Sequence, residues 1–186
     1  MAQATQPVIL AAIAKILDHS RIALKEASEV QCVGMREPIP INAIYQQAHL
    51  VDGRGHDADL LALIRSGEDA IILAEPGRGK TTLVRWAYMQ RDETLFPLLF
   101  TLRHEDAVAD LALLIREPRS AVVKSLPKSH IALLIDGYDE TSEKKRRRVS
   151  NALMTFAGLN LGSFCLTCRT YFINNRSYWI RPHGRF

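Results

Sequence analysis

Short apolar runs alternate with amphipathic segments between residues 69 and 169, and this rhythm restricts the fold more than any other feature of the chain. Strands that are apolar along their whole length are typical of parallel sheets whose two faces are covered by connecting helices. The pattern therefore predicts an α/β fold with a mainly parallel central sheet. Strands are expected at 69–74, 95–103, 130–136 and 163–169, and helices at 80–91, 105–117, 142–158 and, more briefly, near 119–126.

Residues 1–67 are expected to form a helical leader and an extended linker, followed by a core over 68–186. Apolar residues recur at helical spacing over 7–30, which predicts a first helix. Two prolines within 36–45 remove backbone donors and favour extended conformations in the residues before them, so this stretch is expected to be a connector. A second, short helix is expected over 57–65.

The composition is that of an ordinary folded domain. Hydrophobic residues make up 47% of the 186 residues and charged residues 24%, a balance that argues against a disordered chain. The net charge of +4 suits an anionic ligand without indicating nucleic acid. The apolar runs are far shorter than the ~20 residues that a membrane-crossing helix needs. We therefore expect a cytoplasmic protein with no membrane partner.

The chain has three cysteines, an odd number without the spacing of a disulfide framework, which fits a reducing compartment. Cys165 and Cys168 form a C-x-x-C pair within the apolar run FCLTC. No second pair completes a zinc site. We interpret both residues as small side chains of a buried strand rather than as zinc ligands or a redox pair.

A glycine-rich loop joins the first core strand to the helix that follows it. Such a loop aims backbone N–H groups at an anion, and the positive end of the helix attracts the same charge. Gly77 and Gly79 let the backbone approach a phosphate closely, Lys80 supplies a cation for the β- and γ-phosphates, and the Thr81 hydroxyl suits Mg²⁺. The sequence thus predicts a nucleotide-binding loop that consists of Ala74, Glu75, Pro76, Gly77, Arg78, Gly79, Lys80, Thr81 and Thr82.

The loop departs from the common phosphate-loop pattern at one position. Ala74 stands where that pattern has its first glycine. The position is expected at the exit of the strand, where ordinary extended backbone angles suffice and alanine costs little. We therefore expect the loop to bind phosphate despite the substitution.

Acidic and basic residues follow the next core strands. Asp136 ends the run IALLID, and we expect it at the end of a neighbouring strand, where it would hold Mg²⁺ through water. Asp139 and Glu140 come directly after it, close enough to orient or deprotonate an attacking water. After the last strand, Arg169 is a candidate to touch a γ-phosphate, and a surface arginine is the alternative interpretation.

Three segments in this order, AEPGRGKTTL, LLIDGYDE and LTCRTYF, resemble the NACHT class of STAND P-loop NTPases. The resemblance covers about residues 68–175, and the D-G-x-D-E form is its most distinctive part. It implies a three-layer P-loop NTPase sandwich that binds ATP or ADP with Mg²⁺ and hydrolyses ATP slowly. It also implies Lys80 and Thr81 at the phosphates and metal, Asp136 on the metal, Asp139 and Glu140 near the catalytic water, and Arg169 as a sensor of the γ-phosphate.

The resemblance further implies a signalling switch, in which ADP holds a closed monomer and ATP allows a homo-oligomer to form. Bacterial members act in antiviral defence. Members of the class continue into helical and winged-helix domains, whereas only 17 residues follow Arg169 in this chain. We therefore expect a truncated member. A second possibility is an interaction module that binds nucleotide without turnover and pairs with a full-length relative.

Two basic segments raise the alternative of nucleic-acid binding. KKRRR over 144–148 opens a predicted helix, and a tail over 173–186 mixes arginines with aromatic residues. We interpret the first as a solvated helix face and the second as an exposed chain end. Nucleic acid is therefore not an expected partner.

Overall fold

The computed structural model describes residues 22, 24–25, 27–30, 36–46, 48–90, 92, 94–104, 106–116, 130–158 and 162–173. Most of the helix predicted over 7–30 lies outside these residues. The short helix predicted near 119–126 and most of the basic tail lie outside them as well.

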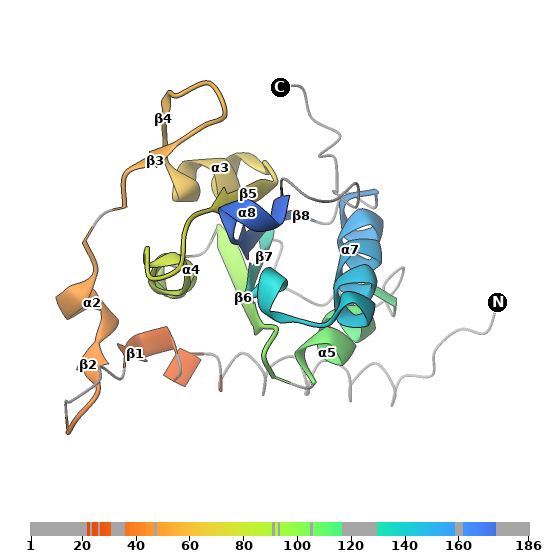
Figure 1. Cartoon of the computed structure of the whole chain (residues 1–186), viewed down its shortest axis with the longest axis horizontal. Coiled ribbons are helices and arrows are strands. Elements are labelled where there is room, and N and C mark those ends of the chain that lie inside the picture. Colours follow the sequence, from red (N-terminus) through yellow and green to blue (C-terminus); the bar gives the residue numbers. More distant parts are fainter. Residues whose placement is uncertain are drawn as a thin grey trace.

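A sheet of four parallel strands forms the centre of the core. Its strands run in the order β5 (Ala70–Leu73), β8 (Gly162–Cys168), β7 (His130–Asp136) and β6 (Leu95–Thr101) (Figure 1). The predicted parallel sheet is confirmed, and each predicted strand appears within a few residues of its expected position. Pro97 is accommodated because β6 lies at an edge of the sheet, where one missing donor need not break a ladder on both sides.

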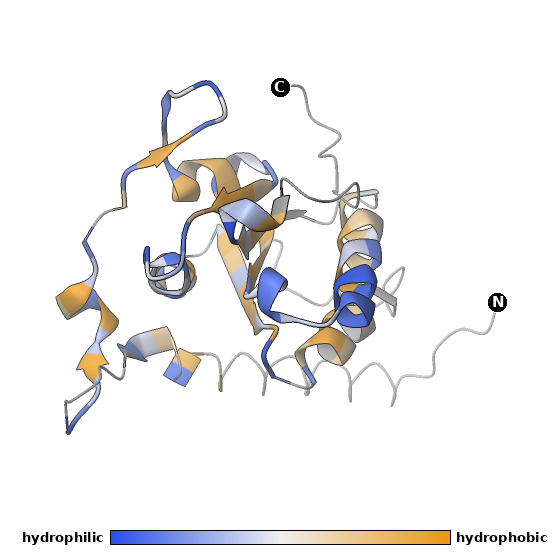
Figure 2. Ribbon diagram, in the orientation of Figure 1, coloured by the Kyte–Doolittle hydropathy of each residue, from blue (hydrophilic) through white to orange (hydrophobic). Residues whose placement is uncertain are grey.

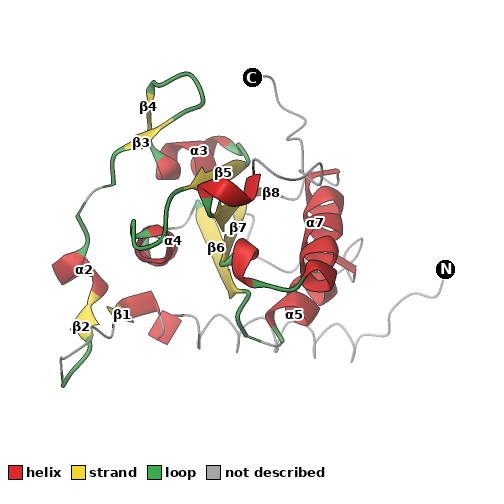
Figure 3. Cartoon of the chain, in the orientation of Figure 1, coloured by secondary structure: helices red, strands yellow, loops and turns green. Residues whose placement is uncertain are grey.

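Helices cover both faces of this sheet (Figure 3). Helices α3 (Leu60–Ser66) and α4 (Lys80–Met89) pack on one face. Helices α5 (Ala107–Arg116) and α7 (Glu143–Gly158) pack on the other. This arrangement is an α/β fold of three layers, helices–sheet–helices, among the described residues.

The two cores explain why the strands of the central sheet are mostly apolar (Figure 2). In β7, Leu133 and Ile135 point into the core beneath α5 and α7, whereas Ala132 and Leu134 point into the core beneath α3 and α4. Successive side chains of a strand face opposite sides of the sheet, so burial on both sides requires an unbroken hydrophobic run. The polar residue that ends this run, Asp136, is thereby carried to the carboxyl edge of the sheet.

The linker differs from the extended connector predicted over 36–45. It contains strand β2 (Ile39–Pro40) and a single helical turn, α2 (Ile41–Ile44). Strand β1 (Glu29–Val30) pairs with β2 antiparallel, so the helix predicted over 7–30 does not extend to its expected last two residues. Pairing with β2 gives the backbone groups of these two residues partners that a helix end would leave unsatisfied.

A second antiparallel pair, β3 (Leu50–Val51) with β4 (Asp57–Ala58), was not predicted. The helix predicted over 57–65 instead begins at Leu60. Asp59 sets this start, because its carboxylate accepts hydrogen bonds from two backbone N–H groups of the first turn, at 2.8 and 3.2 Å. Residues 57–58, which were expected to be helical, therefore form strand β4.

Gly162 is required where β8 enters the sheet. A Cβ atom at this position would overlap the backbone carbonyl of Ile131 on β7. We expect Gly162→Ala to lower the free energy of unfolding by on the order of 2–3 kcal/mol, because the two strands must separate to make room. Urea denaturation measures this change. Gly158→Ala is the control, since no atom lies within 4 Å of the added Cβ there, and equal midpoints for the two variants would contradict the expected clash.

Candidate functional site

The loop between β5 and α4 has the backbone that close approach to an anion requires. Gly77 and Gly79 adopt left-handed φ values of 76° and 78°, which side-chain-bearing residues rarely adopt. An added Cβ at either glycine meets nothing within 4 Å, so the loop borders open space. Helix α4 begins directly after Gly79 without a side-chain cap and with no acidic residue in its first turn. Its first N–H groups therefore lack the carboxylate that commonly satisfies a helix start.

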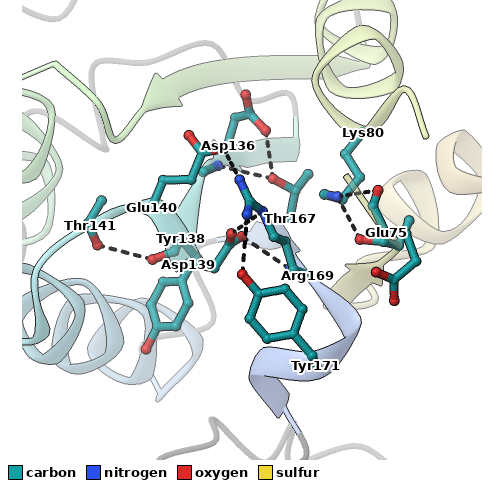
Figure 4. Close-up of polar contacts among 12 residues, drawn as sticks. Glu75, Lys80, Asp136, Tyr138, Asp139, Glu140, Thr141, Thr167, Arg169 and Tyr171 are labelled. Atoms are coloured by element: carbon teal, nitrogen blue, oxygen red, sulfur yellow. Dashed lines mark hydrogen bonds and ion pairs between the residues drawn. The ribbon is translucent and has the colours of Figure 1, made fainter. Parts of the chain in front are cut away.

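Lys80 folds back over this loop (Figure 4). Its Nζ donates to the carbonyl oxygens of Ala74 at 2.6 Å and Glu75 at 3.1 Å. Neither partner is a carboxylate, so no salt bridge neutralises the ammonium among the described contacts of Lys80. The positive charge thus lies at the mouth of the loop, held by two acceptors that an anion can replace.

Thr81 connects the loop to the first acidic residue. Its Oγ1 donates to Oδ2 of Asp136 at 2.8 Å, and Thr167 Oγ1 donates to Oδ1 of the same carboxylate at 2.6 Å. The backbone N–H of Gly137 donates to Thr167 Oγ1 at 3.1 Å, which fixes that hydroxyl. Asp136 is 6% exposed, so these hydroxyl donors compensate a nearly buried carboxylate.

The position of Asp136 corrects one expectation. The acid was expected on a strand next to the one that precedes the loop, but β8 lies between β5 and β7. Thr81 nevertheless reaches Asp136 from the first turn of α4, and Thr167 donates to the same carboxylate from the intervening strand. Thr167 falls within the strand predicted over 163–169, but no function was predicted for it, although a polar residue near the end of a mostly apolar strand was the available signal.

Asp139 lies in η1 (Tyr138–Glu140), the short 3-10 turn after β7, and forms an ion pair with Arg169. Its Oδ2 lies 2.8 Å from Arg169 Nε, and its Oδ1 accepts the backbone N–H of Arg169 at 3.1 Å. The Asp139 side chain is only 3% exposed. This pair fixes the start of α8 (Thr170–Ile173) against the turn.

Glu140 is held by two arginines. Arg169 Nη2 lies 3.2 Å from Oε1, and Arg103 Nε forms an ion pair with Oε2. Hydrogen bonding to Arg103 lowers the pKa of Glu140, and Arg169 lowers it further against the opposing effect of burial. The carboxylate is therefore ionised, and each of its oxygens is engaged by an arginine. Arg169 also donates to Tyr171 Oη at 3.2 Å. Its guanidinium points toward the two acids with which it pairs, Asp139 and Glu140 (Figure 4).

Arg103 was not predicted as a site residue from the sequence. It follows β6 by two residues and so reaches the same edge of the sheet as the acids after β7, where Thr101 lies beside Asp136. A charged residue directly after a buried strand was the signal that could have identified it.

The C-x-x-C pair has the buried environment expected of it. Cys165 and Cys168 are free and buried, and burial raises the pKa of each thiol to about 12. Both remain protonated at neutral pH, which disfavours metal binding and redox exchange. Across the part of the chain that the structure describes, no cluster of three or more His, Cys, Asp or Glu residues is suited to hold a metal ion.

The basic run over 144–148 lies at the start of α7, and part of it is used within the fold. Arg146 donates to the Thr141 carbonyl and lies 4.7 Å from the centre of the Phe172 ring. Arg147 pairs with Glu143 one helical turn away, at 2.8 Å. Of the remaining residues of the run, Lys144 and Arg148 are exposed and Lys145 is half-buried.

No described helix has both the length and the apolar character that crossing a bilayer requires. Comparison with known proteins identifies no relative: no family model matches the chain, and searches of curated proteins and of solved structures return no match.

Proposed function

We propose that the chain is a P-loop NTPase core of the NACHT type that binds ATP or ADP with Mg²⁺. The observation that carries this proposal is the 2.8 Å hydrogen bond between Thr81 and Asp136. It joins the glycine-rich loop to the acid that ends β7, at the carboxyl edge where open α/β sheets bind their ligands. Both residue types and their meeting point are those that a nucleotide with a divalent cation requires.

Three features of the loop between β5 and α4 support the binding of phosphate. The uncapped N–H groups at the start of α4, the open space beside Gly77 and Gly79, and the unneutralised Lys80 ammonium all favour a polyanion. A bound phosphate would take over the Lys80 hydrogen bonds that the carbonyls of Ala74 and Glu75 now accept. Binding would then exchange two neutral acceptors for a charged one.

The residues also fit Mg²⁺. Thr81 and Asp136 offer oxygen donors only, and Mg²⁺ in nucleotide sites commonly takes one or two protein ligands together with phosphate and water. When bound, the ion would neutralise charge on the phosphates.

We further propose slow ATP hydrolysis, coupled to a signalling or defence switch. A water oxygen bonds to the γ-phosphorus, the bond to the β–γ bridging oxygen breaks, and ADP and phosphate form. Glu140 is the candidate to receive the proton of that water, and Asp139 orients Arg169 beside it. Arg169 would be drawn toward the γ-phosphate by its charge.

One observation favours the second possibility, an interaction module that binds nucleotide without turnover. Both oxygens of Glu140 are engaged by arginines, and Asp139 is nearly buried under Arg169. A carboxylate in this state is a weak base. Release of phosphate from ATP distinguishes the two possibilities, because only the NTPase core produces it.

Asp136→Asn tests the proposed function. In the wild-type chain we expect Mg²⁺ to strengthen ATP binding, and in the variant we expect most of that gain to disappear, a loss of roughly tenfold or about 1.4 kcal/mol. The amide keeps the shape of the side chain but removes its charge. Calorimetric titrations with Mg²⁺ and with EDTA measure the effect. Asp52→Asn, in the exposed loop between β3 and β4, is the control, and an unchanged Mg²⁺ dependence in Asp136→Asn would refute the assignment.

A further inference from the structure

Glu140 is clamped by arginines that come from two different strands of the sheet. Arg103 follows β6 and Arg169 follows β8, while Glu140 follows β7, which lies between them. Each arginine takes a different oxygen of the carboxylate, Arg103 at Oε2 and Arg169 at Oε1. The carboxylate is therefore approached from both neighbouring strands at once.

The two arms of this clamp are not equivalent. Arg169 is one-third exposed and is anchored by Asp139 and Tyr171 as well as by Glu140. The Arg103 side chain is 66% exposed, and Glu140 is its one hydrogen-bonded partner among the described residues. An exposed arginine with a single partner can leave that partner without disturbing the core. Of the two arginines, Arg103 is thus the one that can move away from Glu140.

The two arginines weaken Glu140 as a general base. A carboxylate that activates water needs a free lone pair to accept the proton, and its strength as a base rises with its pKa. Both Glu140 oxygens are engaged, and the hydrogen bond from Arg103 is the largest cause of the lowered pKa of this side chain. The charged groups that act on Glu140 are Arg103 after β6 and Arg169 after β8. Asp136 in turn attracts Arg103, and Asp139 pairs with Arg169.

We propose that Arg103 is a positioning residue that restrains Glu140 and so limits the rate of ATP hydrolysis without contacting the nucleotide. This inference rests on the proposed function, because it assigns a regulatory contact to the same site. It predicts an effect on turnover and not on affinity. A surface arginine with only a structural effect would change neither quantity.

The test uses the full chain with Arg103→Gln, Arg103→Lys and the control Arg65→Gln. Arg65 pairs with Asp92 at 2.6 Å, just before β6 and hence at the opposite edge of the sheet. Two quantities are measured: the pKa of the Glu140 carboxyl by NMR, with Glu140→Gln to assign its signal, and kcat and KM for ATP. For Arg103→Gln we expect a raised Glu140 pKa and a kcat raised roughly 3- to 10-fold, with KM unchanged. Arg103→Lys should restore much of the wild-type behaviour, and Arg65→Gln should match wild type.

The outcomes separate this inference from the proposed function. If wild type and Arg103→Gln bind ATP alike but also share the same Glu140 pKa and the same kcat, the clamp is refuted and the nucleotide site stands. A lower kcat in Arg103→Gln would likewise refute the proposal that Arg103 restrains Glu140, since it would mean that Arg103 assists the reaction. If wild type does not bind ATP at all, the proposed function fails, and the catalytic meaning of the clamp fails with it.

Discussion

Replacing Lys80 with alanine is expected to reduce ATP affinity at least roughly 100-fold, equivalent to about 2.8 kcal/mol. The ammonium lies at the mouth of the loop, where its described partners are two neutral carbonyl oxygens, and phosphate binding depends on this charge. The fold should survive, because Lys80 contributes only two hydrogen bonds to carbonyls of its own loop. Calorimetric titration with ATP at constant Mg²⁺ measures the loss.

Lys144→Ala is the matched control for this prediction. Lys144 is an exposed lysine near the start of α7, on the helical layer across the sheet from α4. Removing it changes the net charge by the same amount without touching the loop. Unchanged ATP affinity in Lys80→Ala, or an equal loss in both variants, would show that the loop assignment is wrong.

Glu140→Gln is expected to retain ATP binding and to lose turnover by on the order of 100-fold. The amide keeps an oxygen that can accept from one arginine, but it cannot take a proton from water. Affinity should change little, because the arginines and not the phosphates are the contacts of this side chain in the structure. Single-turnover release of phosphate measures the effect separately from binding.

Glu143→Gln provides the control, since Glu143 pairs with Arg147 on the exposed side of α7. It removes one carboxylate and weakens one ion pair away from the acidic turn. Equal rates of phosphate release in wild type and Glu140→Gln would exclude Glu140 from the reaction. No release from either protein, with ATP bound to both, would instead favour the non-hydrolysing module.

The sequence was sufficient to predict those strands, helices and turns that depend on local residue preferences or on the spacing of apolar residues. The strand predicted at 130–136 coincides with β7, because burial on both faces demands an uninterrupted apolar run with a polar end. Helix α7 begins and ends within one residue of its prediction for the corresponding reason, an apolar stripe at helical spacing. Gly77 and Gly79 were expected to allow close approach of the backbone, and both adopt left-handed angles that only glycine adopts readily.

The order of the strands was not predictable from such signals. Periodicity says which segments are strands, but pairing depends on contacts between residues far apart in the chain. The insertion of β8 between β5 and β7 therefore came as a correction to the expected position of Asp136. The two-residue strands β3 and β4 are too short to leave any alternation in the sequence.

The partners of the long side chains could not be predicted either. Arg169 was expected near a phosphate, and its location at the sheet edge gave no indication that it would pair with Asp139 and Glu140. Arg103 escaped notice because its meaning depends on β6 lying next to β7. A guanidinium at the end of a flexible stem finds its carboxylate through tertiary structure, which spacing along the chain does not encode.

Backbone amide NMR of the full chain during titration with ATP and Mg²⁺ tests the central claim most directly. We predict that the largest shifts fall on the amides of residues 77–81, at the start of α4, and that the amide of Gly137 beside Asp136 responds with them. Saturation with ATP that leaves these amides unchanged, with shifts confined to other parts of the chain, would contradict a phosphate site in the loop between β5 and α4.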